Sequence, residues 1–253
     1  MTVRQGLHQG PSAPDPQPDD AGFDRYTSRS MAMARWVAQR VLLGAVVRSV
    51  ITVRILGRDR LAGLRGAFVV VANHSSHLDA PLIFTTLPRR LARYLAAGAA
   101  ADYFFDVRWR KGLTALFFNA FPIHRSGLHR QQSEARALLQ RGVPLLVFPE
   151  GTRSRTGRIG QFKSGAAALA TSESVPVLPV AIIGASLAHP RGSRWPKPGR
   201  LPVGIVFGEP VFAEPGETST DYMRRVRGEV QRLHDEHAAA VLAPGRASSP
   251  GER

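Results

Sequence analysis

A histidine and an aspartate that follow one apolar run have the side chains needed to move a proton. Residues 69–72 read VVVA and continue as NHSSHLD, residues 73–79. An imidazole with an ordinary pKa of about 6.5 accepts a proton well near neutral pH. A nearby carboxylate fixes its tautomer and stabilises the imidazolium. We expect Ser75 or Ser76 to cap a helix here and His74 to be a general base oriented by Asp79. The alternative is a capping aspartate beside an incidental histidine.

A second polar cluster follows another apolar run and offers groups that bind phosphate. Residues 145–157 read LLVFPEGTRSRTG. Gly151 and Gly157 permit tight turns, while Arg153 and Arg155 carry planar, always charged donors that suit a phosphate. Lys163 comes just before a helix start, where backbone N–H groups add to an anion site. The segment FPIHR adds Arg125 behind an apolar turn. A basic loop that is merely solvated is the alternative for each of these segments.

Several other classes of site are absent from the sequence. The chain has no cysteine, which excludes a disulfide framework, a cysteine metal site and a thiol nucleophile. It has no GxSxG nucleophile elbow and no GxGxxG dinucleotide motif. The net charge of +15 predicts a polyanionic partner, such as nucleic acid, anionic lipid or a phosphorylated substrate. A nucleic-acid-binding protein fits poorly, because the basic residues are spread along the chain and no recognition motif accompanies them.

Short β-branched runs alternate with helical stretches, which predicts an α/β fold with a mostly parallel sheet covered by helices. The expected strands are residues 67–72, 92–97, 143–148, 177–183 and 203–207. Expected helices cover residues 126–141, 164–172 and 220–242. The last of these places a stripe of apolar residues on one face, which is typical of a core contact. We expect one enzyme-sized domain over residues 61–243.

The segment before this domain is expected to contact lipid without crossing it. Residues 31–60 are apolar but interrupted by arginines, and the longest uncharged stretch is far shorter than the ~20 residues of a spanning helix. This pattern predicts interfacial helices whose arginines reach anionic headgroups; a helix packed on the core is the alternative. Residues 1–30 and 244–253 are rich in proline, glycine and polar residues, which predicts disordered tails. The N-terminus lacks the apolar core of a signal peptide, so we expect a peripheral protein on the cytoplasmic face of the membrane.

Taken together, these motifs resemble those of the glycerolipid acyltransferases of the lysophosphatidate and glycerol-3-phosphate type. NHSSHLD resembles the family's first motif, FPIHR the second, FPEGTRSRTG the third and VPVLPV at residues 175–180 the fourth. The order is the same, over residues 61–210. Two positions depart from the family pattern: Asn119 stands where the second motif commonly begins with glycine, and His124 where an acidic residue is frequent.

The resemblance implies a glycerol-3-phosphate acyltransferase-like fold and direct transfer of a fatty acyl group to lysophosphatidate. His74 would deprotonate the acceptor hydroxyl with Asp79 as its partner. No cofactor or metal is implied, and the donor would be acyl-CoA or acyl-carrier protein. The residues implied in acceptor binding are Arg125, Glu150, Gly151, Thr152, Arg153 and Lys163. Glycerol-3-phosphate, or another lipid hydroxyl or amine, remains the alternative acceptor.

Overall fold

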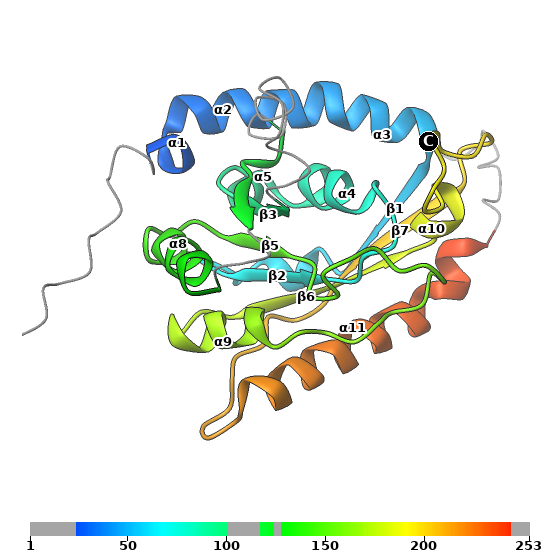
Figure 1. Ribbon diagram of the computed structural model, residues 1–253. Coiled ribbons are helices and arrows are strands. Elements are labelled where there is room, and N and C mark those ends of the chain that lie inside the picture. The colour runs from blue at the N-terminus through cyan, green and yellow to red at the C-terminus, as the bar shows by residue number, and fades with distance from the viewer. Residues whose placement is uncertain (1–23, 101–116, 124–127, 244–253) are drawn as a thin grey trace, which may run out of the picture.

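A seven-stranded sheet forms the centre of the computed structural model, which describes residues 24–100, 117–123 and 128–243 (Figure 1). The strands lie in the order β1-β7-β6-β2-β5-β3-β4. Their bounds are β1 Thr52–Leu56, β2 Val69–Ala72, β3 Ala96–Ala100, β4 Phe121–Ile123, β5 Leu145–Val147, β6 Val177–Ile183 and β7 Pro202–Phe207. Only β6 and β7 run antiparallel among these neighbours. The expected α/β fold with a mostly parallel sheet is therefore confirmed.

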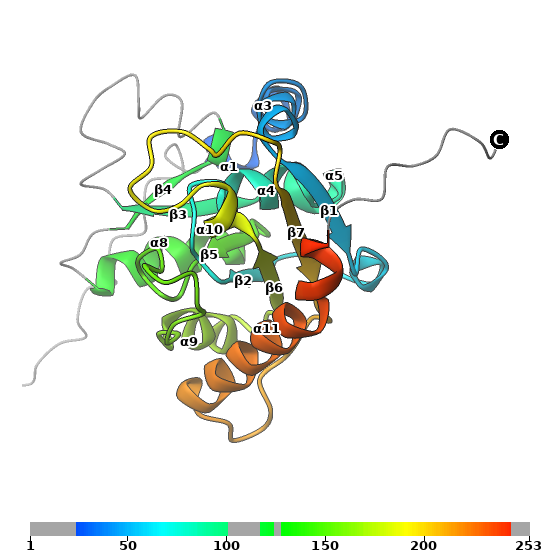
Figure 2. The same ribbon diagram turned by 90° about the vertical axis from the view of Figure 1, so that its right-hand side faces the viewer.

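Helices cover both faces of this sheet, because its central strands are apolar on both sides. All four residues of β2 are buried; Val70 and Ala72 pack into one core, and Val69 and Val71 into the other. The first core includes residues of α4 Asp79–Thr86 and α5 Arg89–Ala92. The second core includes residues of α8 Leu128–Gln140, α9 Gly165–Ser172 and α11 Ser219–Leu242. Figure 2 shows the resulting three layers, with α11 on the side opposite α4.

The N-terminal helices form a rod that lies over α4 (Figure 1). The rod consists of α2 Arg29–Val37, a π-helical turn η2 Ala38–Leu43 and α3 Gly44–Val50, preceded by the short helix α1 Asp24–Thr27. Arg40 donates to the carbonyls of Thr85 and Leu87 at the end of α4, at 2.6 and 3.0 Å. Gln39 donates to the carbonyl of Phe117 at 2.6 Å. The polar side of the rod thus docks on the domain. Within the described ranges, none of the helices combines the length and hydrophobicity of a transmembrane span.

Four expectations about the first hundred residues need correction. The segment 31–60 is not helical throughout, because residues 52–56 form strand β1, which pairs with β7. The tail expected over residues 1–30 ends earlier, since α1 and the start of α2 lie within it and the Tyr26 side chain is buried in the second core. Arg35 is buried and Arg40 binds α4, so neither arginine points to solvent. The expected strand 92–97 begins too early, because residue 92 is the last residue of helix α5; the strand runs over residues 96–100.

The other predicted elements lie within three residues of their expected bounds where the structure describes them. Strands β2, β5, β6 and β7 and helices α9 and α11 fall in the predicted segments. Ser126, the expected start of the helix over residues 126–141, lies outside the described residues, as do residues 1–23 and 244–253 of the expected tails. Parallel β2 and β5 pair Val69 with Leu145 and Val71 with Val147. Their carboxyl ends meet at one edge of the sheet, so the segments that follow them lie close together.

Candidate active site

The candidate site begins at the carboxyl end of β2. Asn73 follows the last residue of β2, and its buried side chain bonds twice to the backbone of Ile182 in β6. Its amide donates to the Ile182 carbonyl at 2.9 Å, and its side-chain oxygen accepts from the Ile182 N–H at 2.7 Å. These two bonds continue the strand pairing with a side chain. They fix the direction in which the next residue, His74, leaves the sheet.

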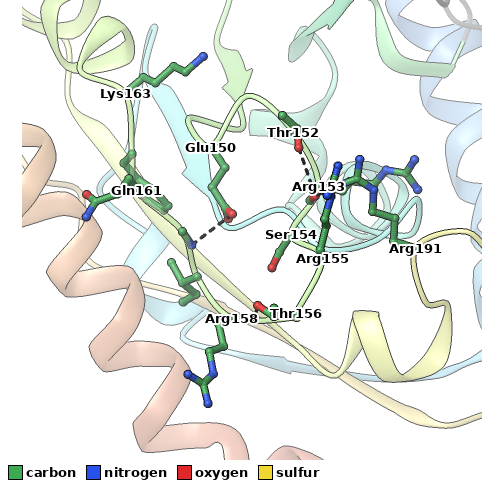
Figure 3. A pocket seen from close by; sticks show the side chains of 13 residues that line it. Glu150, Thr152, Arg153, Ser154, Arg155, Thr156, Arg158, Gln161, Lys163 and Arg191 are labelled. Atoms are coloured by element: carbon green, nitrogen blue, oxygen red, sulfur yellow. Dashed lines mark hydrogen bonds between the residues drawn. The ribbon is translucent and has the colours of Figure 1, made fainter.

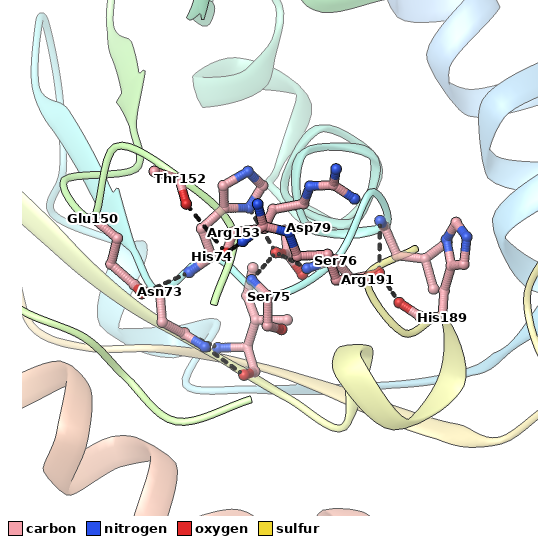
Figure 4. A network of polar contacts seen from close by, with 12 residues as sticks. Asn73, His74, Ser75, Ser76, Asp79, Glu150, Thr152, Arg153, His189 and Arg191 are labelled. Carbon is pink, nitrogen blue, oxygen red and sulfur yellow. Dashed lines mark hydrogen bonds and ion pairs between the residues drawn. The ribbon is translucent and has the colours of Figure 1, made fainter. Parts of the chain in front are cut away.

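His74 and Asp79 are in contact, as the sequence predicted (Figure 4). The Nδ1 atom of His74 lies 2.8 Å from Oδ2 of Asp79, whose side chain is fully buried. The same oxygen accepts the backbone N–H groups of Ser75 and Ser76, at 2.7 and 2.8 Å. Neither serine caps α4 as expected: the helix begins at Asp79, Leu78 occupies the capping position, and the carboxylate closes the turn itself. Three donors on one oxygen hold the Asp79 carboxylate in place.

The imidazole of His74 is held on its face as well as at its edge. Phe148, the residue after β5, stacks on it with ring centroids 4.1 Å apart and an interplanar angle of 17°. The His74 side chain is 22% exposed. Because a carboxylate can only accept at Nδ1, the neutral ring carries its proton there and leaves Nε2 as the basic atom. The ring is therefore fixed in orientation and tautomer while its basic nitrogen stays accessible.

Glu150 supports His74 through the backbone. Its Oε1 accepts the N–H of His74 at 2.8 Å, and its Oε2 accepts the N–H of Gly160 at 3.2 Å. Burial raises the pKa of the Glu150 carboxyl, although these two backbone donors oppose the shift. A Cβ atom on residue 160 would lie 2.9 Å from Oε2 of Glu150. The loop can therefore approach the carboxylate this closely only because residue 160 is glycine. The carboxylate expected in acceptor binding thus ties the first polar segment to the second.

Basic side chains line a pocket next to this cluster (Figure 3). Arg153, Arg155, Arg158, Lys163 and Arg191 line it, and Glu150 is the one acidic residue among the described residues of its wall. We call the pocket that these five cationic side chains line the basic pocket. The expected residues Thr152, Arg153 and Lys163 all line it, and Gly151 turns the chain beside it with a φ of 72°. A pocket with five cations favours an anionic ligand, phosphate above all.

Arg153 is the basic residue of the pocket with the closest link to His74. Its Nη1 atom is buried and has no hydrogen-bond partner within the described part of the chain. Its carbonyl accepts from the Arg191 guanidinium at 2.6 Å. The next residue, Ser154, donates its N–H to the His74 carbonyl at 2.7 Å. A buried guanidinium nitrogen without a partner needs an acceptor, because leaving it unbonded costs about 1–3 kcal/mol or more.

Sequence reasoning missed several residues that shape the site. The sequence pattern does not indicate the roles of four residues, because their partners are distant in the chain. These residues are Asn73, Phe148, Gly160 and Arg191. Arg125, which was expected to bind the acceptor, and His124 lie outside the described residues. Asn119, which stands where the resemblance favours glycine, has a φ of 47°. Asparagine tolerates this left-handed conformation, so the departure in sequence keeps the backbone turn that glycine would allow.

A second imidazole pair lies beside the cluster. The rings of His77 and His189 are 5.6 Å apart and tilted by 38°. Desolvation lowers the pKa of His77, and repulsion from Arg153 adds to the shift. Ser76 donates its hydroxyl to the His189 carbonyl at 3.0 Å, which fastens the segment after α10 Ala185–Ala188 to the first motif. The part of the chain that the structure describes contains no group of three His, Asp or Glu side chains placed to hold a metal ion.

A histidine–carboxylate pair at the carboxyl edge of an α/β sheet, beside a basic pocket, has the chemistry needed to activate a hydroxyl near an anionic group, which is the chemistry of an enzyme site. Comparison with known proteins identifies the family to which the chain belongs. Residues 52–183 match the family described as Acyltransferase, which is half of the chain, and the protein belongs to that family.

Several relatives share this similarity. The chain is 27% identical over 185 residues to the chloroplastic 1-acyl-sn-glycerol-3-phosphate acyltransferase BAT2 of Brassica napus, covering 71% of this chain and 51% of that protein. It is 34% identical over 126 residues to a probable 1-acyl-sn-glycerol-3-phosphate acyltransferase of Mycoplasma pneumoniae, covering 49% of this chain and 46% of the relative. The chain thus spans about half the length of these curated relatives.

A solved structure shows the same fold. The crystal structure of the 1-acyl-sn-glycerophosphate acyltransferase PlsC from Thermotoga maritima superposes with a TM-score of 0.60 at 26% identity. The match covers 85% of this chain and 91% of that one. The expected acyltransferase fold is therefore confirmed, in a chain that belongs to the Acyltransferase family.

Proposed function

We propose that the protein transfers a fatty acyl group from acyl-CoA or acyl-carrier protein to the free hydroxyl of lysophosphatidate, giving phosphatidate. The observation that carries the proposal is the 2.8 Å contact between His74 and Asp79 beside the basic pocket. In this proposal His74 removes the proton of the acceptor hydroxyl, and the basic pocket binds the phosphate of that acceptor. The relatives named for this activity support the same substrate class.

In the proposed reaction, Nε2 of His74 takes the proton of the acceptor hydroxyl as its oxygen attacks the thioester carbonyl carbon. The new C–O bond forms, the C–S bond breaks, and the thiolate leaves with the proton from the imidazolium. Asp79 stabilises the imidazolium between these two steps through the contact at Nδ1. No acyl-enzyme forms, because the acceptor oxygen is itself the nucleophile.

Arg153 is the proposed principal ligand of the acceptor phosphate. Its buried guanidinium nitrogen without a partner faces the pocket wall, and its neighbour Ser154 bonds to His74. A phosphate held by Arg153 would place the glycerol hydroxyl near the imidazole. Lys163 and Thr152 line the same pocket and complete the proposed set, together with Gly151 and with Arg125, which lies outside the described residues. Glu150 contributes by holding the His74 backbone.

A thiol-release assay tests this proposal directly. Purified protein receives an acyl-CoA together with lysophosphatidate, glycerol-3-phosphate or no acceptor, with His74→Ala measured in parallel. We expect thiol release that depends on lysophosphatidate and on His74. Release with glycerol-3-phosphate alone would correct the acceptor, and absence of release with acyl-CoA and with acyl-carrier protein would refute the proposal.

We also propose that the N-terminal rod rests on the membrane that contains the acceptor. The rod binds the domain through Gln39 and Arg40 and through Val47, which is part of the first core, whereas six of its large apolar side chains are exposed. The exposed side chains are Met31, Met33, Val37, Val41, Leu42 and Val46, each between 45% and 61% exposed. An apolar strip of this size on the outside of a helix costs free energy in water and gains it in a lipid interface. Of the arginines expected to touch headgroups, Arg35 and Arg40 instead bond to carbonyls of the protein, whereas Arg48 is exposed.

Vesicle sedimentation tests this second part. The triple variant Val41→Ser, Leu42→Ser, Val46→Ser removes three exposed apolar side chains and leaves the docked side of the rod intact. We expect binding to anionic vesicles to weaken by at least about a hundredfold, because each such side chain contributes about 1.5 kcal/mol. Phe212→Ser, which changes an exposed side chain directly after the bridge between Val177 and Val211, is the matched control. Equal binding of both variants would show that the rod does not contact lipid.

A further inference from the structure

The loop between α10 and β7 carries an exposed tryptophan among basic residues. Trp195 is 81% exposed, the largest fraction for any large apolar side chain in the described part of the chain. The residues around it read RGSRWPKPGR, residues 191–200, with four basic side chains that are all exposed. No acidic residue occurs between Glu173 and Glu209. The loop is therefore a purely cationic surface with one large aromatic side chain at its centre.

This loop has a defined conformation. The N–H of Lys197 donates to the carbonyl of Ala188 at 2.7 Å, and the N–H of Ser193 donates to the carbonyl of Pro190 at 3.1 Å. The His189 ring bonds to the Ser193 carbonyl at 3.1 Å. Three prolines at positions 190, 196 and 198 restrict the backbone further. Trp195 is thus presented to solvent by a loop whose backbone is held, which lowers the entropy cost of binding through it.

The loop lies at the end of the N-terminal rod. Thr52, two residues after α3, donates its N–H to the Leu201 carbonyl at 3.1 Å and its hydroxyl to the Arg200 carbonyl at 3.0 Å. Figures 1 and 2 both place the loop beside the C-terminal end of α3. The rod and the cationic loop are therefore neighbours at one end of α3. Leu187 of α10, 52% exposed, adds an apolar side chain next to the loop.

We propose that residues 187–200 form a second membrane contact, in which Trp195 enters the headgroup region and Arg194, Lys197 and Arg200 bind anionic lipid headgroups. The inference rests on the proposed function in taking the acceptor to be a membrane lipid. Tryptophan prefers the membrane interface because its ring is apolar and its N–H is polar. Basic side chains at an anionic surface add attraction that salt weakens. A basic loop without an aromatic would suit any polyanion; the exposed indole favours lipid.

Two contacts at different points fix an orientation that one helix leaves free. A single rod can roll about its axis on the membrane, whereas a rod and a loop at its end define a plane. Arg191 begins the loop and also lines the basic pocket, where it bonds to the Arg153 carbonyl. The lipid-facing loop is thus continuous with the wall of the acceptor pocket. A lysophosphatidate headgroup leaving the interface would pass along this loop to His74.

The test compares Trp195→Ala and the pair Arg194→Ala, Lys197→Ala with the control Phe212→Ala in the full chain. Binding is measured by sedimentation with vesicles of phosphatidylcholine alone and of phosphatidylcholine with phosphatidylglycerol. We expect Trp195→Ala to weaken binding about tenfold on both vesicles. The double variant should lose about fivefold per charge on the anionic vesicles only. Unchanged binding of Trp195→Ala on both vesicles would overturn the proposal.

Turnover separates this inference from the proposed function. With a short-chain acceptor that stays monomeric in water, Trp195→Ala should retain the wild-type rate, because residue 195 does not line the pocket. With the acceptor embedded in vesicles, its rate should fall with its binding. If Trp195→Ala instead raised KM for acyl-carrier protein and bound vesicles normally, the loop would be a site for an acidic protein and the lipid inference would be wrong. Vesicle binding that depends on Trp195 in a protein inactive on every acceptor would refute only the proposed function.

Discussion

The His74 cluster, which comprises residues 73–79 with Glu150, and the basic pocket share a border but differ in how their polar groups are bonded. In the cluster, Oδ2 of Asp79 has three partners and each Glu150 oxygen has one, whereas Oδ1 of Asp79 is buried without a partner among the described residues. In the pocket, Arg153 has a buried nitrogen without a partner among the described residues. The His74 ring is therefore positioned before any substrate arrives, whereas the Arg153 nitrogen has no acceptor until an anion enters. Such a division predicts that changes in the cluster lower kcat and changes in the pocket raise KM.

The largest expected effect is that of His74→Ala. Losing the base should lower kcat about 10³- to 10⁴-fold with little change in KM for the acceptor. The fold should persist, because the backbone of residue 74 makes the bonds to Glu150 and Ser154. Steady-state kinetics and circular dichroism check both points. His234→Ala, a change on α11 outside the cluster, is the control. A folded His74→Ala protein with a normal kcat would remove His74 as the base.

Asp79→Asn should have the next largest effect. An asparagine oxygen at the Oδ2 position can still accept from Nδ1 of His74 and from the N–H groups of Ser75 and Ser76, but it lacks the negative charge that stabilises the imidazolium. We expect kcat to fall about 10²- to 10³-fold while KM and thermal stability stay close to wild type. Asp59→Asn, outside the cluster, controls for the lost charge. If kcat fell no further than in the control, the carboxylate would serve only to begin α4.

Arg153→Ala tests the other side of the comparison. Loss of a charge-assisted contact to phosphate should raise the acceptor KM about 10- to 100-fold, with a smaller change in kcat. Arg153→Lys should recover part of this loss, because a point charge replaces the planar donor. Arg224→Ala on the outside of α11 is the matched control. An unchanged KM in Arg153→Ala would place the acceptor phosphate elsewhere.

The smallest expected effect concerns Glu150→Gln and pH. Because burial raises the pKa of Glu150, the folded protein holds this proton more tightly than the unfolded chain. The resulting contribution to the free energy of unfolding is fully present below the unfolded pKa of about 4.3 and is lost as pH rises through the folded value. The free-energy difference between wild type and Glu150→Gln should therefore shrink as pH rises across this window. Urea unfolding at several pH values measures it, and a difference independent of pH would contradict the assignment.

The sequence predicts the parts of this structure that depend on local patterns. The continuous apolar runs of β2 and β6 and the stripe on α11 define their elements without tertiary information. His74 and Asp79 could be paired because they are close in the chain. Parallel pairing of β2 and β5 then explains why the two polar segments meet.

The remaining features depend on contacts between distant residues. Strand β1 was placed in the helical segment because its pairing partner, β7, lies about 150 residues away. The arginines of the rod have helical spacing, but periodicity identifies a face and not its direction. Arg40 points inward because the carbonyls of Thr85 and Leu87 end α4 there. Glu150 belongs to a motif expected to bind the acceptor, yet its partners are backbone N–H groups at residues 74 and 160.

The pairing of β1 with β7 also sets an order of events during synthesis. The rod leaves the ribosome early, but the strand that follows it has no neighbour in the sheet until residues 202–206 have been made. Residues 85, 87 and 117, whose carbonyls bind Arg40 and Gln39, are synthesised before β7. Since domains fold as units, the apolar strip of the rod is available while the sheet is still incomplete. If the rod binds lipid as proposed, a nascent chain reaches the bilayer through residues 31–46 before β7 completes the sheet.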